Sequence, residues 1–296
     1  MLKFKKLQLC DIESVRRFFP YSANRICDNT VGGAFMWRDY FSVEFAEYNE
    51  TIIFKAKVKY HNNITAFSMP LGKDLHGSIR KVAEYCGHEH LPVAFYTVTN
   101  EDVKILSTVF TNYSLLRDAD WSDYIYNAED LASLSGRKYS GQRNHINYFN
   151  RTYSNYIFEE ISESNLEQVR EFYAKYSAGI TLDSGVFIEE HIKTSELLDN
   201  YDTYGLSGGL LKVNGSVIAF SIGEIINNVL FIHVEKADSN YRGSHQVVSH
   251  AFANHFTSAA VEYINREEDV GDEGLRISKK SYHPCEIIEK YTLLVI

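Results

Sequence analysis

The chain has 296 residues, of which 45% are hydrophobic and 23% charged, and its formal net charge at pH 7 is −9. This composition is typical of a globular protein, and the acidic balance excludes a broadly basic nucleic-acid-binding surface but not a local basic groove. No run approaches the roughly 18 apolar residues of a membrane span, and the N-terminus lacks the apolar core of a signal peptide. We therefore expect a soluble, cytoplasmic protein of one large domain or two smaller ones.

The first half of the chain predicts an alternation of strands and helices, because apolar residues recur at strand or helix spacing. In chain order we expect a strand over 2–9, helices over 11–19 and 30–40, a hairpin over 41–58 around Asn49-Glu50, a strand over 64–69, a helix over 75–87, a strand over 92–98, a helix over 100–108 and a strand over 122–127.

The second half contains the clearest local signal, a three-strand antiparallel meander over 207–235. Asn214-Gly215 and Asn227-Asn228 each separate two strand-like runs, and such pairs favour tight hairpin turns. Before the meander we expect a strand over 156–161, a helix that begins at a capping box of Ser164 and Glu167, and a helix over 185–198. After it we expect a helix with Val247 and other apolar residues facing inward, a short helix over 285–291 and a terminal strand over 292–296.

The order of elements is similar in the two halves, although no residue-level repeat is visible. It indicates an α+β protein of two similar domains, each a mixed, mostly antiparallel sheet flanked by helices. We expect an N-terminal domain over 1–135, a linking helix over 136–152 and a C-terminal domain over 153–296.

Four stretches of the chain resemble one known family: 27–41 ("CDNTVGGAFMWRDYF"), 134–149 ("LSGRKYSGQRNHINYF"), 233–252 ("HVEKADSNYRGSHQVVSHAF") and 264–284 ("INREEDVGDEGLRISKKSYHP"). The family is named for the C-terminal domain of phosphatidylglycerol lysyltransferase, and the resemblance covers nearly the whole chain. It implies a tandem GNAT fold, of the acyl-CoA N-acyltransferase type and related to the Fem-type aminoacyltransferases. It also implies transfer of an aminoacyl group from aminoacyl-tRNA to an amine or hydroxyl. We expect a small-molecule or lipid-headgroup acceptor, no transmembrane segment and no DNA partner.

His233 and Glu235 alternate with Val234 near the end of a predicted strand, so we expect both side chains on one face of the sheet. In the GNAT fold the end of this strand is where the acyl donor meets the amine. The resemblance therefore implies that Glu235 is the general base and that His233 binds substrate. Tyr241 and Tyr282 are further candidates for donating a proton to the leaving group. The alternative is a buried Glu235 paired with a lysine or an arginine.

The segment 136–151 is the best basic patch in an acidic chain. Arg137, Lys138 and Arg143 could hold the phosphates of a tRNA acceptor end, and Asn144 could add hydrogen bonds. A plain solvated helix is the alternative interpretation.

The residues that follow the meander argue against acyl-CoA as the donor. GNAT enzymes that use acyl-CoA carry small residues in a loop that brings backbone N–H groups to the pyrophosphate at a helix N-terminus. Here that loop begins at Arg242, and His245 and Val247 stand where small residues are expected. We expect no required cofactor, and we keep Arg242 as a substrate-binding candidate. An acyl-CoA-dependent N-acetyltransferase and a non-catalytic binding protein on the same fold stay open as alternatives.

The acidic stretch 264–284 does not have the spacing of a calcium loop, and the four cysteines show no CxxC pattern, so we expect no metal site and reduced thiols. We expect Asn265 to close a helix and Leu275-Arg276-Ile277 to enter a strand beside the one that carries Glu235. On that strand Arg276 and Lys279 would bind an anionic donor or acceptor.

Overall fold

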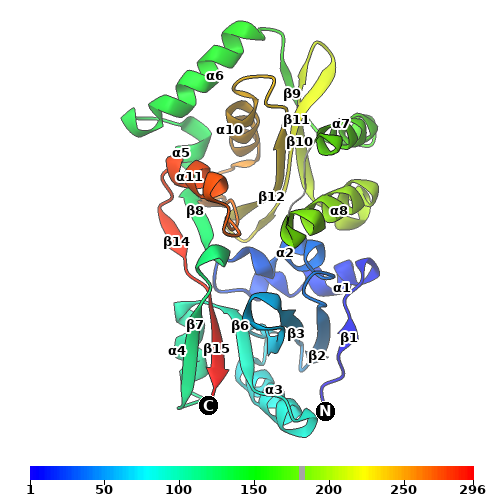
Figure 1. The fold of residues 1–296 in the computed structure, drawn as a ribbon, viewed down its shortest axis with the longest axis vertical. Coiled ribbons are helices and arrows are strands. Elements are labelled where there is room, and N and C mark those ends of the chain that lie inside the picture. Colours follow the sequence, from blue (N-terminus) through cyan, green and yellow to red (C-terminus); the bar gives the residue numbers. More distant parts are fainter. Residues whose placement is uncertain (180–183) are drawn as a thin grey trace. The chain divides into compact units, whose positions relative to one another are not determined.

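The structure is a computed structural model that describes residues 1–179 and 184–296. Contacts between residues divide the chain into two compact units. Unit 1 comprises Met1–Asp123, Glu268–Gly271 and Ile287–Ile296, and unit 2 comprises Tyr124–Glu267 and Asp272–Glu286. The fold is shown in Figure 1.

Unit 1 is built on an eight-stranded mixed sheet in the order β1-β2-β3-β4-β6-β15-β7, with β5 paired to β3. Its pairs are antiparallel except for the parallel pair β4–β6. The strands are β1 (Lys5–Lys6), β2 (Glu44–Tyr48), β3 (Thr51–Val58), β4 (Ile64–Phe67), β5 (Leu71–Gly72), β6 (Ala94–Val98), β7 (Tyr113–Arg117) and β15 (Tyr291–Val295). The predicted hairpin is confirmed: Asn49 and Glu50 both adopt left-handed backbone angles between β2 and β3.

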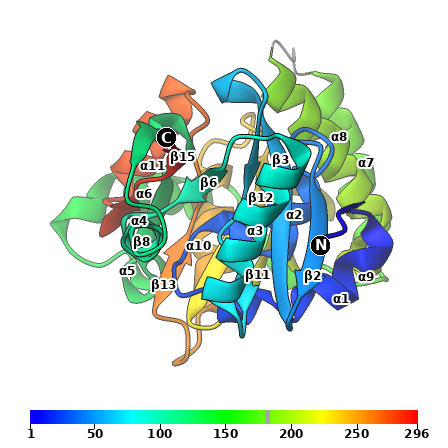
Figure 2. The same ribbon diagram turned by 90° about the horizontal axis from the view of Figure 1, so that it is seen from below.

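Three of the four α-helices described in unit 1 begin at a side-chain N-cap, and the first one lacks such a cap. The helices are α1 (Ile12–Arg16), α2 (Val31–Met36), α3 (Leu75–Glu89) and α4 (Asn100–Ser107). Thr30, Asp74 and Thr99 accept backbone N–H groups at the starts of α2, α3 and α4. Helix α3 lies across one face of the sheet (Figure 2), and Ile79 and Val82 pack there among the buried residues of the strands.

Unit 2 is built on a seven-stranded sheet in the order β14-β8-β13-β12-β11-β10-β9, in which β12 and β13 are parallel. The strands are β8 (Asp123–Asn127), β9 (Ile157–Glu160), β10 (Ser207–Val213), β11 (Ser216–Ile226), β12 (Val229–Ala237), β13 (Tyr263–Asn265) and β14 (Glu286–Ile288). The predicted meander is confirmed as β10-β11-β12, with left-handed backbone at Asn214, Gly215 and Asn227 in its two turns.

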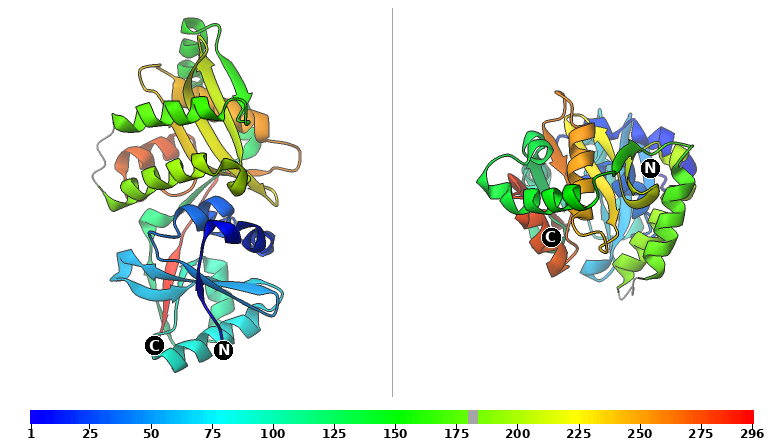
Figure 3. Two further views of the ribbon diagram at one scale, coloured as in Figure 1. Left: turned by 90° about the vertical axis from the view of Figure 1, so that its right-hand side faces the viewer. Right: turned by 90° about the horizontal axis from the view of Figure 1, so that it is seen from above.

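Helices cover both faces of this sheet (Figures 1 and 3). Helix α10 packs on β11 and β12 from one side, together with α5 and α6, and α7 packs on β11 from the other side, together with α8. The helices are α5 (Ala128–Ser133), α6 (Ser140–Thr152), α7 (Leu166–Ala178), α8 (Gly185–Asp199), α9 (Tyr201–Tyr204), α10 (Ser244–Phe256) and α11 (Glu273–Ser281). Among the described residues, no helix is both long and apolar enough to cross a membrane.

Several local predictions were wrong. Residues 285–291 do not form a helix; they contain β14, which is anchored where the N–H of Cys285 donates to the carbonyl of Ile125. Helix α7 begins at Leu166 after Asn165, whose side chain accepts the N–H of Ser162, so the predicted capping box is absent. Strand β7 was not predicted.

The terminal strand was predicted correctly, but it lies in a different sheet from the one expected. β15 pairs with β6 and β7 of unit 1, and Leu293 is buried in the core of that unit. The two units defined by residue contacts therefore differ from the domains that we expected, with boundaries at 135 and 153. Apolar alternation identifies a strand, but it carries no information about which sheet the strand joins.

Candidate active site

Strand β12 carries two of the predicted site residues next to an irregularity in its pairing with β11. Ile222 pairs with Val234, whereas the next residue, Gly223, pairs with Ile232, so His233 is an extra residue in β12. Gly223 allows this close approach, because a Cβ atom there would lie 2.1 Å from the carbonyl oxygen of Phe231. The regular alternation that predicted a shared face for His233 and Glu235 is thus interrupted.

His233 is buried between two carboxylates. Its Nδ1 lies 2.7 Å from Oε1 of Glu267, and its Nε2 lies 2.9 Å from Oε1 of Glu224. Burial alone would lower the pKa of His233, but the two hydrogen bonds outweigh it and raise the pKa to about 10. Both ring nitrogens then donate, and the imidazolium ties β11 to the segment after β13.

Glu235 is paired with an arginine that the sequence did not single out. Nη2 of Arg266 donates to Oε1 of Glu235 across 2.9 Å, and the two side chains are 11% and 14% exposed. The guanidinium of Arg266 also lies over the ring of Tyr282, 4.7 Å from its centre. This ion pair is the alternative that the sequence left open for Glu235.

Two polar atoms of the Glu235–Arg266 ion pair make no hydrogen bond to the described residues. Oε2 of Glu235 and Nη1 of Arg266 are buried, and neither has a hydrogen-bond partner among the residues that the structure describes. An unmet hydrogen bond of a buried polar atom costs about 1–3 kcal/mol, so two such atoms in one ion pair need an explanation. Together they offer one acceptor for a proton and one donor for a negatively charged oxygen.

The two candidate tyrosines have different surroundings. Tyr282 is buried against Arg266, and burial raises its pKa although Arg266 acts in the opposite direction, so its hydroxyl is protonated at neutral pH. Tyr241 is half-buried and packs on Tyr153, with 5.2 Å between the ring centres. Arg266 therefore contacts both Tyr282 and Glu235, whereas Tyr241 packs on a different residue.

The predicted basic patch lies on and before α6, and part of it is engaged within unit 2. Lys138 is paired with Asp130 at 2.8 Å. Nη1 of Arg143 donates to the carbonyls of Leu134 and Gly136, which ties α6 to the end of α5. Arg137 and Asn144 are exposed.

The N-terminus of α10 is closely covered by α6. Gly243 has a φ of +95°, and a Cβ atom there would lie 2.6 Å from the carbonyl oxygen of His145 and 3.1 Å from Cβ of Phe149. The preceding residue, Arg242, is exposed and places its guanidinium 4.6 Å from the ring centre of Tyr148 on α6. Direct packing of α6 against this turn leaves little room for a pyrophosphate at the helix end.

The family described as "Phosphatidylglycerol lysyltransferase, C-terminal" matches residues 19–294. The chain belongs to this family. A solved structure of a conserved protein of unknown function from Bacteroides thetaiotaomicron VPI-5482 is 32% identical to it, with 100% of each chain covered and a TM-score of 0.91. The C-terminal domain of a putative lysylphosphatidylglycerol synthetase from Agrobacterium fabrum has 13% identity and a TM-score of 0.67, over 98% of this chain and 93% of that one.

A further relative is an uncharacterised protein of Mycoplasmoides gallisepticum, 27% identical over 177 residues, which are 59% of this chain. The chain spans 56% of the length of that curated relative. Membership of the lysyltransferase C-terminal family confirms the resemblance seen in the sequence. The two sheets flanked by helices confirm the α+β class. Family and fold point to an acyltransferase-like function.

Three residues of the family's signature stretch lie on a different element from the one predicted. Asn265 ends β13 rather than a helix, and Arg276 and Lys279 lie on α11, which Asp272 caps, rather than on a strand. The strand beside β12 is β13. Three residues apart on a helix, Arg276 and Lys279 share one face, and Nζ of Lys279 lies 5.9 Å from the ring centre of Tyr124.

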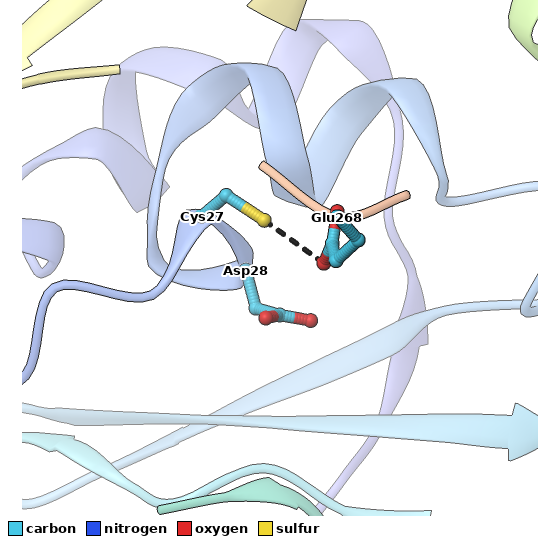
Figure 4. Close-up of side chains that lie close together, drawn as sticks. All are labelled: Cys27, Asp28 and Glu268. Atoms are coloured by element: carbon cyan, nitrogen blue, oxygen red, sulfur yellow. Dashed lines mark hydrogen bonds between the residues drawn. The ribbon is translucent and has the colours of Figure 1, made fainter. Parts of the chain in front are cut away.

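A cluster of charged residues in unit 1 was not predicted from the sequence. Nζ of Lys290, just before β15, lies 2.6 Å from Oδ2 of Asp28, 2.6 Å from Oε1 of Glu268 and 3.1 Å from Oδ1 of Asp123. Figure 4 shows Asp28 and Glu268 beside Cys27. No local sequence pattern identifies Lys290 as part of this cluster. Arg266 could have been predicted, because a buried Glu235 needs a cationic partner and Arg266 lies near the start of the signature stretch.

Proposed function

We propose that the chain transfers an aminoacyl group from aminoacyl-tRNA to an amine or hydroxyl acceptor, with Glu235 and Arg266 of unit 2 at the reacting atoms. The observation that carries the proposal is the pair of unsatisfied atoms, Oε2 of Glu235 and Nη1 of Arg266. Membership of a family named for a lysyltransferase supports the class of reaction.

The chemistry needs no covalent enzyme intermediate. The acceptor attacks the ester carbonyl of the donor, and Oε2 of Glu235 takes the proton that the amine or hydroxyl gives up. Nη1 of Arg266 donates to the oxygen that becomes negative in the tetrahedral intermediate. When the ester C–O bond breaks, the hydroxyl of Tyr282 gives its proton to the ribose oxygen that leaves.

Basic residues of unit 2 would hold the donor's phosphates. We propose the exposed Arg137 and Arg242, with Lys138, Arg143, Asn144, Arg276 and Lys279, as contacts of the tRNA acceptor end. Tyr241 stays a proposal as a second proton donor, and His233 as a group that orders the substrate side of β12.

The close packing of α6 on the α10 N-terminus supports aminoacyl-tRNA over acyl-CoA as the donor. The acceptor belongs to the class of small molecules or lipid headgroups. The Agrobacterium relative named as a putative lysylphosphatidylglycerol synthetase provides one specific candidate, phosphatidylglycerol.

A panel experiment tests the proposal. Purified protein is incubated with tRNA charged with radiolabelled amino acids, and with extracts, amines or phosphatidylglycerol vesicles as acceptors, and the label is followed into products that are not tRNA. A parallel calorimetric titration measures binding of acetyl-CoA. Transfer of label from at least one charged tRNA, with no saturable binding of acetyl-CoA, is expected. Saturable binding of acetyl-CoA with acetyl transfer, and no transfer from any charged tRNA, would overturn the proposal.

A further inference from the structure

Unit 1 contains a cavity that the proposed transfer does not use. About 50 Å³ of it is available to water-sized molecules, which is several times the volume that one water needs. Six of the seventeen described residues that line it are aromatic, and the lining comes from α2, from β3 and β6 and from the segments beside them. The aromatic residues are Trp37, Phe41, Phe54, Tyr60, Tyr96 and Trp121.

The aromatic wall is packed ring against ring. Trp121 stacks on Tyr60 with 5.1 Å between ring centres, and Phe41 meets Trp121 edge-on at 5.4 Å. Burial raises the pKa values of Tyr60 and Tyr96, so both hydroxyls stay neutral. The faces of such rings carry negative potential and attract cations.

Acidic groups form the polar part of the same wall. Cys27, Asp28 and Glu268 line the cavity, and Figure 4 shows their side chains converging, with the thiol of Cys27 donating to Oε1 of Glu268 at 3.1 Å. Asp123 lies behind them, with Oδ1 3.3 Å from the sulfur of Cys27. The side chain of Glu268 is 8% exposed.

The cluster holds more acids than bases. Asp28, Asp123 and Glu268 face Lys290, so three carboxylates and one ammonium leave two negative charges in excess when all are ionised. Burial raises the pKa of Asp28, and that of Asp123 to about 7, because the charged forms are desolvated beside like charges. A cation bound in the cavity would reduce this excess of negative charge. It would interact favourably with both the carboxylates and the faces of the aromatic rings.

A bare metal ion fits the cavity less well than an organic cation does. Sγ of Cys27 and the carboxylates of Asp28 and Glu268 lie within 4.8 Å of one another, close enough to hold a metal. Nζ of Lys290 lies beside Asp28 and Glu268, so a cation of either kind shares these two carboxylates with it. Burial and the neighbouring acids raise the pKa of Cys27, so its sulfur is a protonated thiol rather than a thiolate ligand. The aromatic walls suit a hydrocarbon body.

We infer that the cavity of unit 1 binds a small organic ammonium, its charged group beside Asp28 and Glu268 and its carbon atoms against Trp37, Tyr60 and Trp121. The inference stands on unit 1 alone and is independent of the proposed transfer in unit 2. It adds to the protein a binding site for alkylamines or for a larger molecule that carries an alkylammonium.

The two tryptophans of the chain both line this cavity, so intrinsic fluorescence reports its occupancy directly. The protein is titrated with n-butylammonium chloride and, separately, with n-butanol, the neutral molecule of the same length, at constant ionic strength. N-acetyltryptophanamide corrects for quenching in solution. We expect a saturable change with butylammonium and at least tenfold weaker binding of butanol. If the fluorescence of the wild-type protein responds equally to the two molecules, or shows no saturable response to butylammonium, the inference is overturned.

Variants locate the bound cation. Asp28→Asn removes one charge at nearly constant shape and is expected to weaken butylammonium binding at least tenfold, as is Glu268→Gln. Asp202→Asn, an exposed aspartate of unit 2, is the matched control and should bind as the wild type does. Circular dichroism checks that each variant is folded. Unchanged binding in every folded variant of the cluster, or tight binding of Zn²⁺ with none of butylammonium, contradicts the assignment.

Discussion

Arg266 donates from Nη2 to Oε1 of Glu235 across 2.9 Å, while the other oxygen of the carboxylate and the other terminal nitrogen of the guanidinium have no hydrogen-bond partner among the described residues. A purely structural ion pair of this kind would normally use its remaining hydrogen-bonding atoms. In the Glu235–Arg266 pair, Oε2 remains available to accept a hydrogen bond and Nη1 remains available to donate one. A reaction that moves a proton and forms an oxyanion needs both groups.

The first prediction concerns the coupling of these two residues in stability. Arg266→Met leaves the Glu235 carboxylate buried without its cation and should lower the free energy of unfolding by ~3–5 kcal/mol. The double variant with Glu235→Gln should lose ~1–3 kcal/mol less than the sum of the two single changes.

Urea unfolding followed by circular dichroism measures the four proteins of this cycle. Arg80→Met, at an exposed arginine of α3, is the control and should change stability by less than about 0.5 kcal/mol. Strict additivity of the two single variants would show that the ion pair does not contribute as a unit.

The second prediction is a dependence of stability on alkaline pH. The pKa of His233 rises from 6.5 to about 10 on folding, because Glu224 and Glu267 hydrogen-bond its charged form. Its contribution is therefore fully present below pH 6.5 and is lost as the pH rises through 10, and it amounts to at most ~5 kcal/mol.

The measured quantity is the difference in unfolding free energy between the wild type and His233→Gln from pH 6 to pH 10. This difference should shrink steadily with rising pH, whereas His76→Gln, at an exposed histidine, should show no such trend. A difference that is constant over this range would mean that the imidazole is neutral in the folded protein.

The third prediction separates close packing at the start of α10 from backbone strain. Gly243 and Gly136 both have positive φ angles, +95° and +85°, but a Cβ atom would clash only at Gly243, since nothing lies within 4 Å of it at Gly136. Gly136→Ala should cost about 1–2 kcal/mol from the backbone alone, and Gly243→Ala should cost clearly more. Equal costs in thermal or urea unfolding would show that α6 does not press on this turn.

The fourth prediction concerns the basic residues of α11. If Arg276 and Lys279 contact phosphates, affinity for charged tRNA falls steeply with salt, and each alanine variant reduces the slope of log K against log salt by about 1. Lys3→Ala, at an exposed lysine of unit 1, should leave the slope unchanged. Filter binding or fluorescence anisotropy at several salt concentrations decides this, and salt-independent binding would remove these residues from the proposal.

Much of the fold could be predicted from local patterns. The meander follows from Asn214-Gly215 and Asn227, because few residues other than asparagine and glycine adopt left-handed turn angles easily. The partners of β15, by contrast, are set by contacts between residues nearly 200 positions apart, such as Leu293 and Phe95, which no local pattern encodes. The helix α11 was missed because apolar Leu275 and Ile277 suggested a strand, although Asp272 provided an N-cap signal.

The candidate site was predictable in part. Alternation along β12 pointed to Glu235, but the partner Arg266 follows a parallel strand reached by a long connection through α10, so its proximity could not be derived from spacing. The register shift at His233 is likewise a property of the β11–β12 pair and not of either strand alone. The cluster around Lys290 brings together residues from four separate segments of the chain, so no local pattern predicts it.

The central claim is tested most directly by single-turnover transfer from a radiolabelled aminoacyl-tRNA that the acceptor panel has shown to be used. Wild type, Glu235→Gln and the exposed control Glu163→Gln are compared at saturating enzyme, with tRNA affinity measured in parallel. The account predicts that Glu235→Gln lowers the transfer rate by ~10²–10⁴-fold with little change in tRNA affinity, while Glu163→Gln behaves as the wild type. Transfer by Glu235→Gln at the wild-type rate would contradict it.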